Sequence, residues 1–173
     1  LKISEMLAGQ YLILYNLLSG TIDPSRMFHD PLYTLAFGTD ASFYRLIPKL
    51  VIKAKNDKEI SLIMRETNRL NLPVTYRAAG TSLSGQSISD SVLVIAGEHW
   101  RGYEILEGGN KIKLQPGLKG SAANMLLSRY GRKIGPDPAS IDTAMIGGIA
   151  ANNASGMCCG IADNSYKTVA GMK

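Results

Sequence analysis

The sequence predicts an α+β protein with a small parallel β-α-β lobe followed by a second, mixed lobe with antiparallel strands. Three short apolar runs at residues 49–55, 73–78 and 91–97 are rich in β-branched residues, which is typical of buried strands. Residues 102–117 alternate apolar and polar positions around a Gly-Gly-Asn turn, which predicts an antiparallel hairpin. The chain has 173 residues, of which 45% are hydrophobic, enough for one ordinary domain or two small lobes.

The N-terminal segment predicts helices that precede the first lobe. Residues 4–19 form an apolar pattern that Ser4 would cap and Gly20 would end. The pairs Asp23-Pro24 and Asp30-Pro31 each place a capping side chain before a proline, so a short helical turn is expected after both. We expect residues 1–41 to form a helical arm.

The first lobe is expected at residues 42–98. A helix is predicted within residues 56–72, with Asp57 as its N-cap and an apolar face made of Ile60, Ile63, Met64 and Leu70. The β-α-β order predicts a parallel pair of strands. A glycine- and serine-rich loop follows the second strand at its carboxyl end, where ligands bind in open α/β sheets.

The second lobe is expected at residues 99–173. After the hairpin, residues 121–131 predict a helix with Ser121 as N-cap and Gly131 as its stop. Residues 131–160 then predict a long loop that is rich in glycine and proline and poor in charge. Long irregular loops in compact domains are usually functional.

Composition disfavours several classes of function. The net charge of +5 is scattered, without a run of Lys or Arg, so nucleic-acid binding is not expected. Cys158 and Cys159 are adjacent and have no metal-binding spacing, which favours small buried thiols and a reducing compartment. His29 and His99 lie in no catalytic or metal-binding pattern. The apolar run at residues 11–18 is too short to span a bilayer.

The glycine- and serine-rich loop resembles a Walker A loop without its lysine. Gly80 and Gly85 have the required spacing, but Gln86 stands where ATP chemistry needs Lys. Glycines permit positive φ angles, so backbone N–H groups can converge on an anion. Such a loop suits the diphosphate of a dinucleotide better than a nucleoside triphosphate. The alternative is an ordinary surface loop.

The long loop of the second lobe has features that suit a flat heteroaromatic ring. Two prolines stiffen residues 135–138, and Gly147-Gly148 permits close approach. Asn152 and Asn153 offer amide groups beside Gly156. The alternative is a tight turn with side-chain capping.

These stretches resemble a known family. "VTYRAAGTSLSGQSISDSVLVI" and "GPDPASIDTAMIGGIAANNASGMCCG" are similar to the two flavin-binding stretches of the vanillyl-alcohol-oxidase-type (PCMH-type) FAD-binding domain. "GTDASFYRLIPKLVIKAKNDKEISLIM" resembles the beginning of that domain in FAD-linked D-2-hydroxyacid dehydrogenases, the branch of D-lactate and D-2-hydroxyglutarate dehydrogenases. The resemblance implies the PCMH-type fold, with FAD between two α+β subdomains, the second of them incomplete.

The resemblance also implies which residues bind FAD. Those expected around the pyrophosphate are Arg77, Ala79, Gly80, Thr81, Ser82, Leu83, Ser84 and Gly85, with Gln86 and Ser87 closing the loop. Those expected to approach the rest of the cofactor are Pro136, Asp137, Pro138, Ser140, Thr143, Gly147, Gly148, Asn152, Ser155 and Gly156. Many relatives attach flavin to a histidine in the first stretch. Ser82 and Ser84 stand there in this chain, so the resemblance implies non-covalent FAD.

The resemblance further implies that this chain is an N-terminal fragment. Members of the branch continue into a substrate-binding cap domain, and often into an iron–sulfur domain, where the catalytic residues would lie. The parent would oxidise a D-2-hydroxyacid such as D-lactate, D-2-hydroxyglutarate or glycolate by hydride transfer to FAD, while the fragment itself would be inactive. The expected location is cytoplasmic, with peripheral association at the inner face of the membrane through respiratory electron acceptors. The alternative function is a non-catalytic nucleotide-binding or regulatory module.

Overall fold

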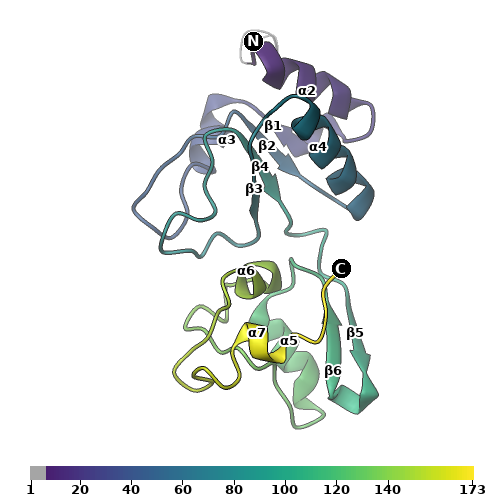
Figure 1. The fold of residues 1–173 in the computed structure, drawn as a ribbon, viewed down its shortest axis with the longest axis vertical. Coiled ribbons are helices and arrows are strands. Elements are labelled where there is room, and N and C mark those ends of the chain that lie inside the picture. Colours follow the sequence, from purple (N-terminus) through teal and green to yellow (C-terminus); the bar gives the residue numbers. More distant parts are fainter. Residues whose placement is uncertain (1–6) are drawn as a thin grey trace. The chain divides into compact units, whose positions relative to one another are not determined.

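The computed structural model describes residues 7–173 and divides them into two compact units (Figure 1). The first unit ends at His99, and the second runs from Trp100 to Lys173. The α+β class that the sequence predicts is confirmed, because the first unit holds a mixed sheet with helices and the second an antiparallel hairpin with helices. The predicted boundaries at residues 41 and 98 stay predictions.

The first unit is built on a four-stranded sheet in the order β1-β2-β4-β3. Strands β2 (Leu50–Lys53) and β3 (Val74–Arg77) are both parallel to β4 (Val92–Ile95), which lies between them. The predicted parallel orientation is therefore confirmed, but the two strands that helix α4 (Asp57–Arg69) connects do not pair directly, because β4 lies between them. Strand β1 (Met27–Phe28) adds an antiparallel edge to β2 that the sequence did not indicate.

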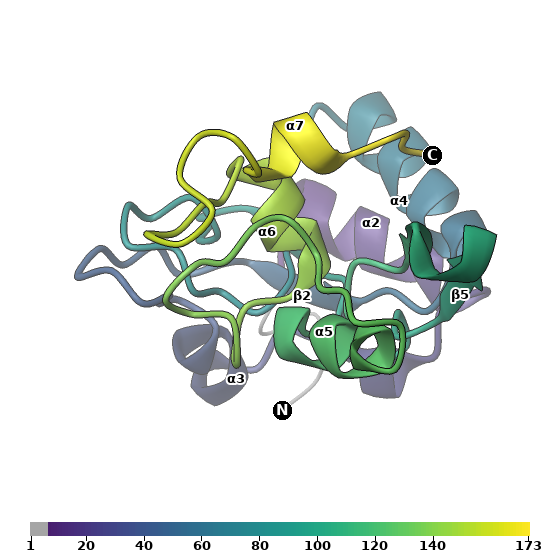
Figure 2. The ribbon, with the colours of Figure 1, turned by 90° about the horizontal axis from the view of Figure 1, so that it is seen from below.

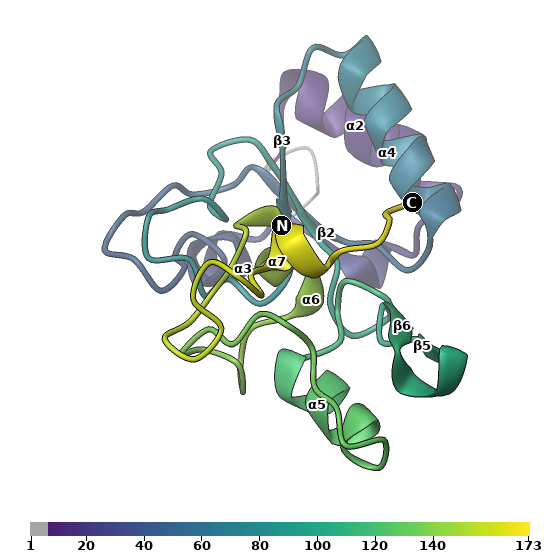
Figure 3. The same cartoon turned by 60° about the horizontal axis from the view of Figure 1, so that its bottom comes forward.

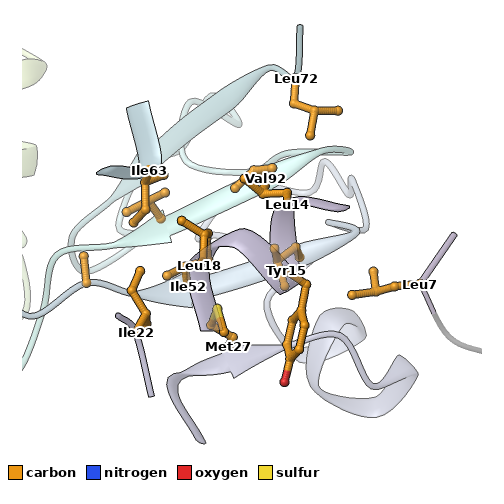
Figure 4. Packing of buried hydrophobic residues seen from close by; sticks show 13 residues of the cluster. Leu7, Leu14, Tyr15, Leu18, Ile22, Met27, Ile52, Ile63, Leu72 and Val92 are labelled. Carbon is orange, nitrogen blue, oxygen red and sulfur yellow. The ribbon is translucent and has the colours of Figure 1, made fainter. Parts of the chain in front are cut away.

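The core of the first unit lies between this sheet and helices α2 (Gly9–Ser19) and α4 (Asp57–Arg69). Figure 4 shows Leu14 and Leu18 of α2 and Ile63 of α4 packed toward Ile52 and Val92 of the sheet. All five side chains are fully buried, and each contributes about 2 kcal/mol through the hydrophobic effect. Helix α2 is thus part of this core.

The helix ends agree only partly with the sequence predictions. Gly20 ends α2 as expected, but this helix begins at Gly9 with Ala8 as its N-cap, so residues 7 and 8 of the predicted helix are not helical. Ser4 lies outside the described residues. Asp23 caps a 3-10 turn (Pro24–Arg26), and Asp30 caps α3 (Pro31–Ala36), each by accepting a backbone N–H bond of 2.9 Å, so both predicted caps are confirmed.

Two predictions for α4 are wrong. Its N-cap is Asn56, whose Oδ1 accepts the backbone N–H of Glu59 at 3.0 Å, and Asp57 is the first helical residue. Met64 is exposed, at 55% of its surface, because the buried face is centred on Ile63 and includes Thr67. Met64 is one residue beyond Ile63, so it projects about 100° away from that face.

The second unit begins with the predicted hairpin of β5 (Tyr103–Leu106) and β6 (Lys111–Leu114), joined by a 3-10 turn at Glu107–Gly109. Helix α5 (Gly120–Ser128) follows, but Ser121 is not its cap. Lys119 occupies that position without a side-chain bond, and the Ser121 backbone N–H donates to the Ile141 carbonyl at 3.0 Å. The helix ends at Ser128 with Arg129 as its C-cap, so the predicted stop at Gly131 is wrong. Gly131 lies in the turn that follows, with a φ of +65°.

The long loop at residues 131–160 is interrupted by helix α6 (Ile146–Ala151), which the sequence did not indicate. A further short helix, α7 (Ser165–Thr168), lies beside α6 (Figures 2 and 3). Ser165 joins them, because its hydroxyl donates to the carbonyls of Ile149 at 3.0 Å and Ala154 at 2.9 Å.

The two cysteines have different environments. Cys159 is buried, as expected, but Cys158 is exposed, and neither forms a disulfide. Over residues 7–173 no group of His, Cys, Asp and Glu side chains could hold a metal ion. Within the same range, no helix is long and apolar enough to cross a membrane.

Candidate functional site

The first candidate region is the loop at residues 77–87, which we call the first loop. It leaves the carboxyl end of β3 and runs beside residues 37–44 (Figures 1 and 3). Gly80 and Gly85 have φ angles of +74° and +71°, so both adopt the left-handed conformation that the sequence predicts. The backbone can therefore turn sharply twice within this loop.

Arg77 anchors the beginning of the first loop to residues 37–39. Its Nη1 donates to the carbonyl oxygens of Thr39 at 2.7 Å and Phe37 at 3.2 Å. A Cβ atom added to Gly80 would lie only 2.4 Å from the Arg77 guanidinium, so the two residues pack in direct contact. Burial lowers the pKa of Arg77, although the Asp40 carboxylate opposes this shift, and a guanidinium stays charged regardless.

The Ser82 hydroxyl organises the middle of the first loop. It donates to Gln86 Oε1 at 2.7 Å and accepts the backbone N–H groups of Ser84 at 3.2 Å and Gln86 at 3.3 Å. Gln86, which stands in place of the Walker lysine, therefore folds back onto its own loop. The loop presents backbone and hydroxyl groups instead of a point charge.

Asp40 holds the end of the first loop. Its Oδ2 accepts the Ser87 hydroxyl at 3.1 Å, and its Oδ1 accepts the backbone N–H and hydroxyl of Ser42 at 2.9 and 2.5 Å. Burial raises the pKa of Asp40, but the hydrogen bonds from Ser42 and Ser87 outweigh it, so the pKa lies below its usual value. Sequence reasoning missed Asp40, although the Asp-x-Ser pattern is a turn signal.

The second candidate region lies in the second unit, at residues 131–160, which we call the second loop. Two of its segments touch where a Cβ atom added to Gly156 would lie 1.6 Å from the Asp137 carbonyl oxygen. The Cys159 sulfur accepts the backbone N–H of Gly156 at 3.0 Å. Lys133 and Asp137 form an ion pair of 3.3 Å on the same segment. The second loop is therefore closely packed at this crossing.

The other predicted residues of the second loop surround helix α6. The Ser140 carbonyl accepts the backbone N–H of Thr143 at 2.9 Å, which makes a turn before the helix. Gly147 and Gly148 lie in the first turn of α6, and Asn152 caps its C-terminus. A Cβ atom added to Gly148 would meet nothing within 4 Å, so the backbone is open there.

The predicted residues thus form two local groups. Residues 77–87 lie together in the first unit, and residues 136–156 lie together in the second. Pro136 and Pro138 are buried, whereas Leu83, Ser84, Gln86, Asn152 and Ser155 are exposed.

The residue types fit an FAD molecule. The first loop offers hydroxyl groups and two left-handed glycines at a strand end, the arrangement that lets backbone N–H groups surround a diphosphate. It holds no lysine, which suits the lower charge of an esterified diphosphate. It also holds no histidine for covalent attachment.

Comparison with known proteins agrees with these features. The family model described as "FAD binding domain" matches residues 48–173, which is most of the chain. Glycolate oxidase subunit GlcD of Escherichia coli (strain K12) is 32% identical over 120 residues, covering 68% of this chain and 24% of that protein. The D-2-hydroxyglutarate dehydrogenase of Pantoea ananatis is 29% identical over 126 residues, covering 70% and 12%.

The chain therefore spans about a quarter of the first of these relatives and about an eighth of the second. Among solved structures, an alkyldihydroxyacetonephosphate synthase superposes with a TM-score of 0.73 at 18% identity, covering 90% of this chain and 33% of that one. This similarity shows a shared fold. Together with the family match and the geometry of the two loops, it establishes that the chain belongs to the family of FAD-binding domains of the PCMH type.

Proposed function

We propose that this chain is the FAD-binding portion of a flavoprotein that oxidises a D-2-hydroxyacid. The observation that carries the proposal is the first loop, which places two left-handed glycines and several hydroxyl groups at the carboxyl end of a parallel strand. The relatives that resemble the chain are named for glycolate, D-2-hydroxyglutarate and D-lactate, which are all 2-hydroxyacids.

The first loop binds the FAD pyrophosphate in this proposal. Donors of the loop that make no internal bond among the described residues, such as the hydroxyls of Thr81 and Ser84, donate to the phosphate oxygens. Arg77 supports the loop through the carbonyls of Thr39 and Phe37. The second loop contacts the remainder of the cofactor, and the open backbone at Gly148 provides room for close approach. FAD, when bound, supplies the hydride acceptor of the oxidation.

The attachment of FAD is non-covalent in this proposal, because Ser82 and Ser84 stand where many members of the family carry the histidine that binds flavin. Acid precipitation tests it directly. Flavin should appear in the supernatant of the precipitated protein, and flavin that stays in the pellet would contradict non-covalent binding.

Gly80→Val in the full-length protein tests the placement of the pyrophosphate. The new side chain would collide with Arg77 and would strain a backbone held at a φ of +74°, so flavin retention after gel filtration should be abolished. The matched control is Gly108→Val, because Gly108 also has a positive φ, +62°, but lies in the hairpin of the second unit with nothing within 4 Å of its Cβ position.

Normal flavin absorbance in Gly80→Val would rule out that the first loop binds the FAD pyrophosphate. A wild-type protein that is colourless and binds only a mononucleotide would instead favour a regulatory nucleotide-binding module. In the full-length protein, we further propose a cytoplasmic location and peripheral association with a respiratory electron acceptor. Membrane fractionation, with the reduction of added quinone as readout, tests that association.

A further inference from the structure

Residues 37–42 are tied to the first loop at three points that are spread along its length. Arg77 at the beginning donates to the Thr39 carbonyl at 2.7 Å. Gly80 in the middle accepts the Ala41 backbone N–H at 3.1 Å. Ser87 at the end donates its hydroxyl to Asp40 Oδ2 at 3.1 Å. The conformation of the first loop therefore depends on contacts with a segment that precedes it by about 40 residues.

At the end of the first loop, the tie depends on one side chain. The two oxygens of Asp40 have different partners: Oδ1 accepts the backbone N–H and hydroxyl of Ser42, and Oδ2 accepts the hydroxyl of Ser87. An ionised carboxylate has enough lone pairs to accept all three hydrogen bonds at once. Asp40 thus connects a turn of its own segment to the last residue of the first loop.

A carboxylate beside a phosphate is unfavourable, because the two negative charges repel. The hydrogen bonds of Asp40 go to Ser42 and Ser87, so its contribution to the pyrophosphate site passes through the residues that it holds. The positive charge of Arg77 lies close enough to Asp40 to interact with it electrostatically, which offsets part of the repulsion.

We propose that Asp40 is a positioning residue of the cofactor site, which fixes Ser87 and with it the closing end of the first loop. The inference rests on the proposed function, in which this loop surrounds the pyrophosphate. Its consequence is that the loop is pre-organised before FAD arrives, so that less conformational entropy is lost on binding.

The chain offers a matched control for Asp40. Asp23 has the same Asp-x-Ser pattern in the same unit, and its Oδ1 accepts the Ser25 backbone N–H at 2.9 Å. Asp23 caps a 3-10 turn and makes no contact with the first loop among the interactions of the described residues. Asp23→Ala therefore removes a similar turn bond without releasing Ser87.

The test measures the FAD dissociation constant of the full-length protein by flavin fluorescence. Asp40→Ala should raise the dissociation constant about tenfold, the loss expected for a charge-assisted hydrogen bond. Ser87→Ala should raise it less, and the double variant should resemble Asp40→Ala alone, because both changes break one contact. Asp40→Asn should recover most of the affinity, since its amide can accept from Ser42 and donate to Ser87.

Asp23→Ala should leave the dissociation constant unchanged. Equal losses of affinity in Asp40→Ala and Asp23→Ala would overturn the inference, and so would effects of Asp40→Ala and Ser87→Ala that multiply independently. Gly80→Val separates this failure from that of the proposed function. If Gly80→Val loses FAD while Asp40→Ala keeps it, the loop binds FAD but Asp40 does not position it.

A second measurement does not need FAD. Hydrogen exchange of the flavin-free protein reports directly on the order of residues 78–87. Asp40→Ala should speed exchange in this stretch several-fold over Asp23→Ala. Equal exchange in the two variants would overturn the inference even if the wild-type protein held no flavin.

Discussion

The two candidate loops are held in place by different physical means. The first loop is tied to residues 37–42 by hydrogen bonds: Arg77 donates to the Thr39 carbonyl, and Ser87 donates to Asp40. The Gly80 carbonyl accepts the Ala41 backbone N–H. The second is held by contacts at Gly156 and Gly135 that are too close for any Cβ atom. Hydrogen bonds can be weakened one at a time, whereas a close backbone contact tolerates no added atom. We therefore expect graded responses to substitution in the first unit and abrupt ones in the second.

The largest effect is expected from Gly156→Ala. The added methyl group would lie 1.6 Å from the Asp137 carbonyl oxygen, so the two segments of the second loop must separate. The free energy of unfolding should fall by more than about 3 kcal/mol, at the upper end for overpacking. Urea unfolding followed by the fluorescence of Trp100, the single tryptophan, measures it in the second unit.

Gly148→Ala is the control for that prediction. A Cβ atom there meets nothing within 4 Å, and the residue lies in helix α6. Replacement should stabilise the flavin-free protein by about 0.5–1 kcal/mol. If both variants lost the same stability, close packing at Gly156 would not be what holds the second loop.

A smaller effect is expected from breaking the ion pair between Arg26 and Glu59 in the first unit. Arg26 binds both Glu59 oxygens at 2.7 Å, and the Glu59 side chain is only 6% exposed. Glu59→Ala should cost about 2–3 kcal/mol in urea unfolding, because it leaves a largely buried guanidinium unpaired. Glu66→Ala is the control, because the Glu66 side chain is also largely buried, at 10% exposed, but its partners Arg65 and Arg69 reach solvent. Its loss leaves no guanidinium buried and should cost less than that of Glu59.

The same ion pair predicts a pH dependence. Burial raises the pKa of Glu59, but the hydrogen bonds from Arg26 and Lys55 outweigh it and hold the pKa below its ordinary value. A carboxyl group whose pKa is lower in the folded state adds stability above its unfolded pKa, about 4.3. This stability is lost as the pH falls through the folded pKa. The difference between wild type and Glu59→Ala should thus be constant near neutral pH and shrink in acid; a difference that grew in acid would contradict this sign.

The smallest effect is expected at the helix caps. Asn56→Ala removes the bond to the Glu59 backbone N–H and should cost about 1 kcal/mol in thermal or urea unfolding. Ser121→Ala should change stability by less than about 0.5 kcal/mol, because Ser121 makes no capping bond to α5. An equal cost for both substitutions would show that the cap geometry does not decide helix stability here.

The sequence predicts those parts of the fold that local patterns determine. Strands β2, β3 and β4 were predictable because β-branched apolar runs mark buried strands. Helix α6 was not, because Gly147 and Gly148 disfavour helices and the helix depends on tertiary contacts. Among these, Ile149 is buried and the Gly147 backbone N–H donates to the Pro116 carbonyl.

The candidate site divides in the same way. The left-handed conformations of Gly80 and Gly85 follow from residue type, so the sequence predicts them. The contact between Asp40 and Ser87 joins residues 47 positions apart. No local sequence pattern specifies which distant hydroxyl will donate to the Asp40 carboxylate. The turn at Asp40 was foreseeable, but its partner was not.

The first loop also belongs to the crossover connection between strands β3 and β4. Strands β3 and β4 are adjacent and parallel, so the chain must travel back along the full length of the strand before it can enter β4. Residues 78–91 make this return without a helix, unlike most parallel crossovers. The return must be long enough to bring Val92 into register with Val74. The sheet thus sets a lower limit on the length of this loop, while the identity of its side chains stays open to change, so the same segment closes the sheet and can carry a binding site.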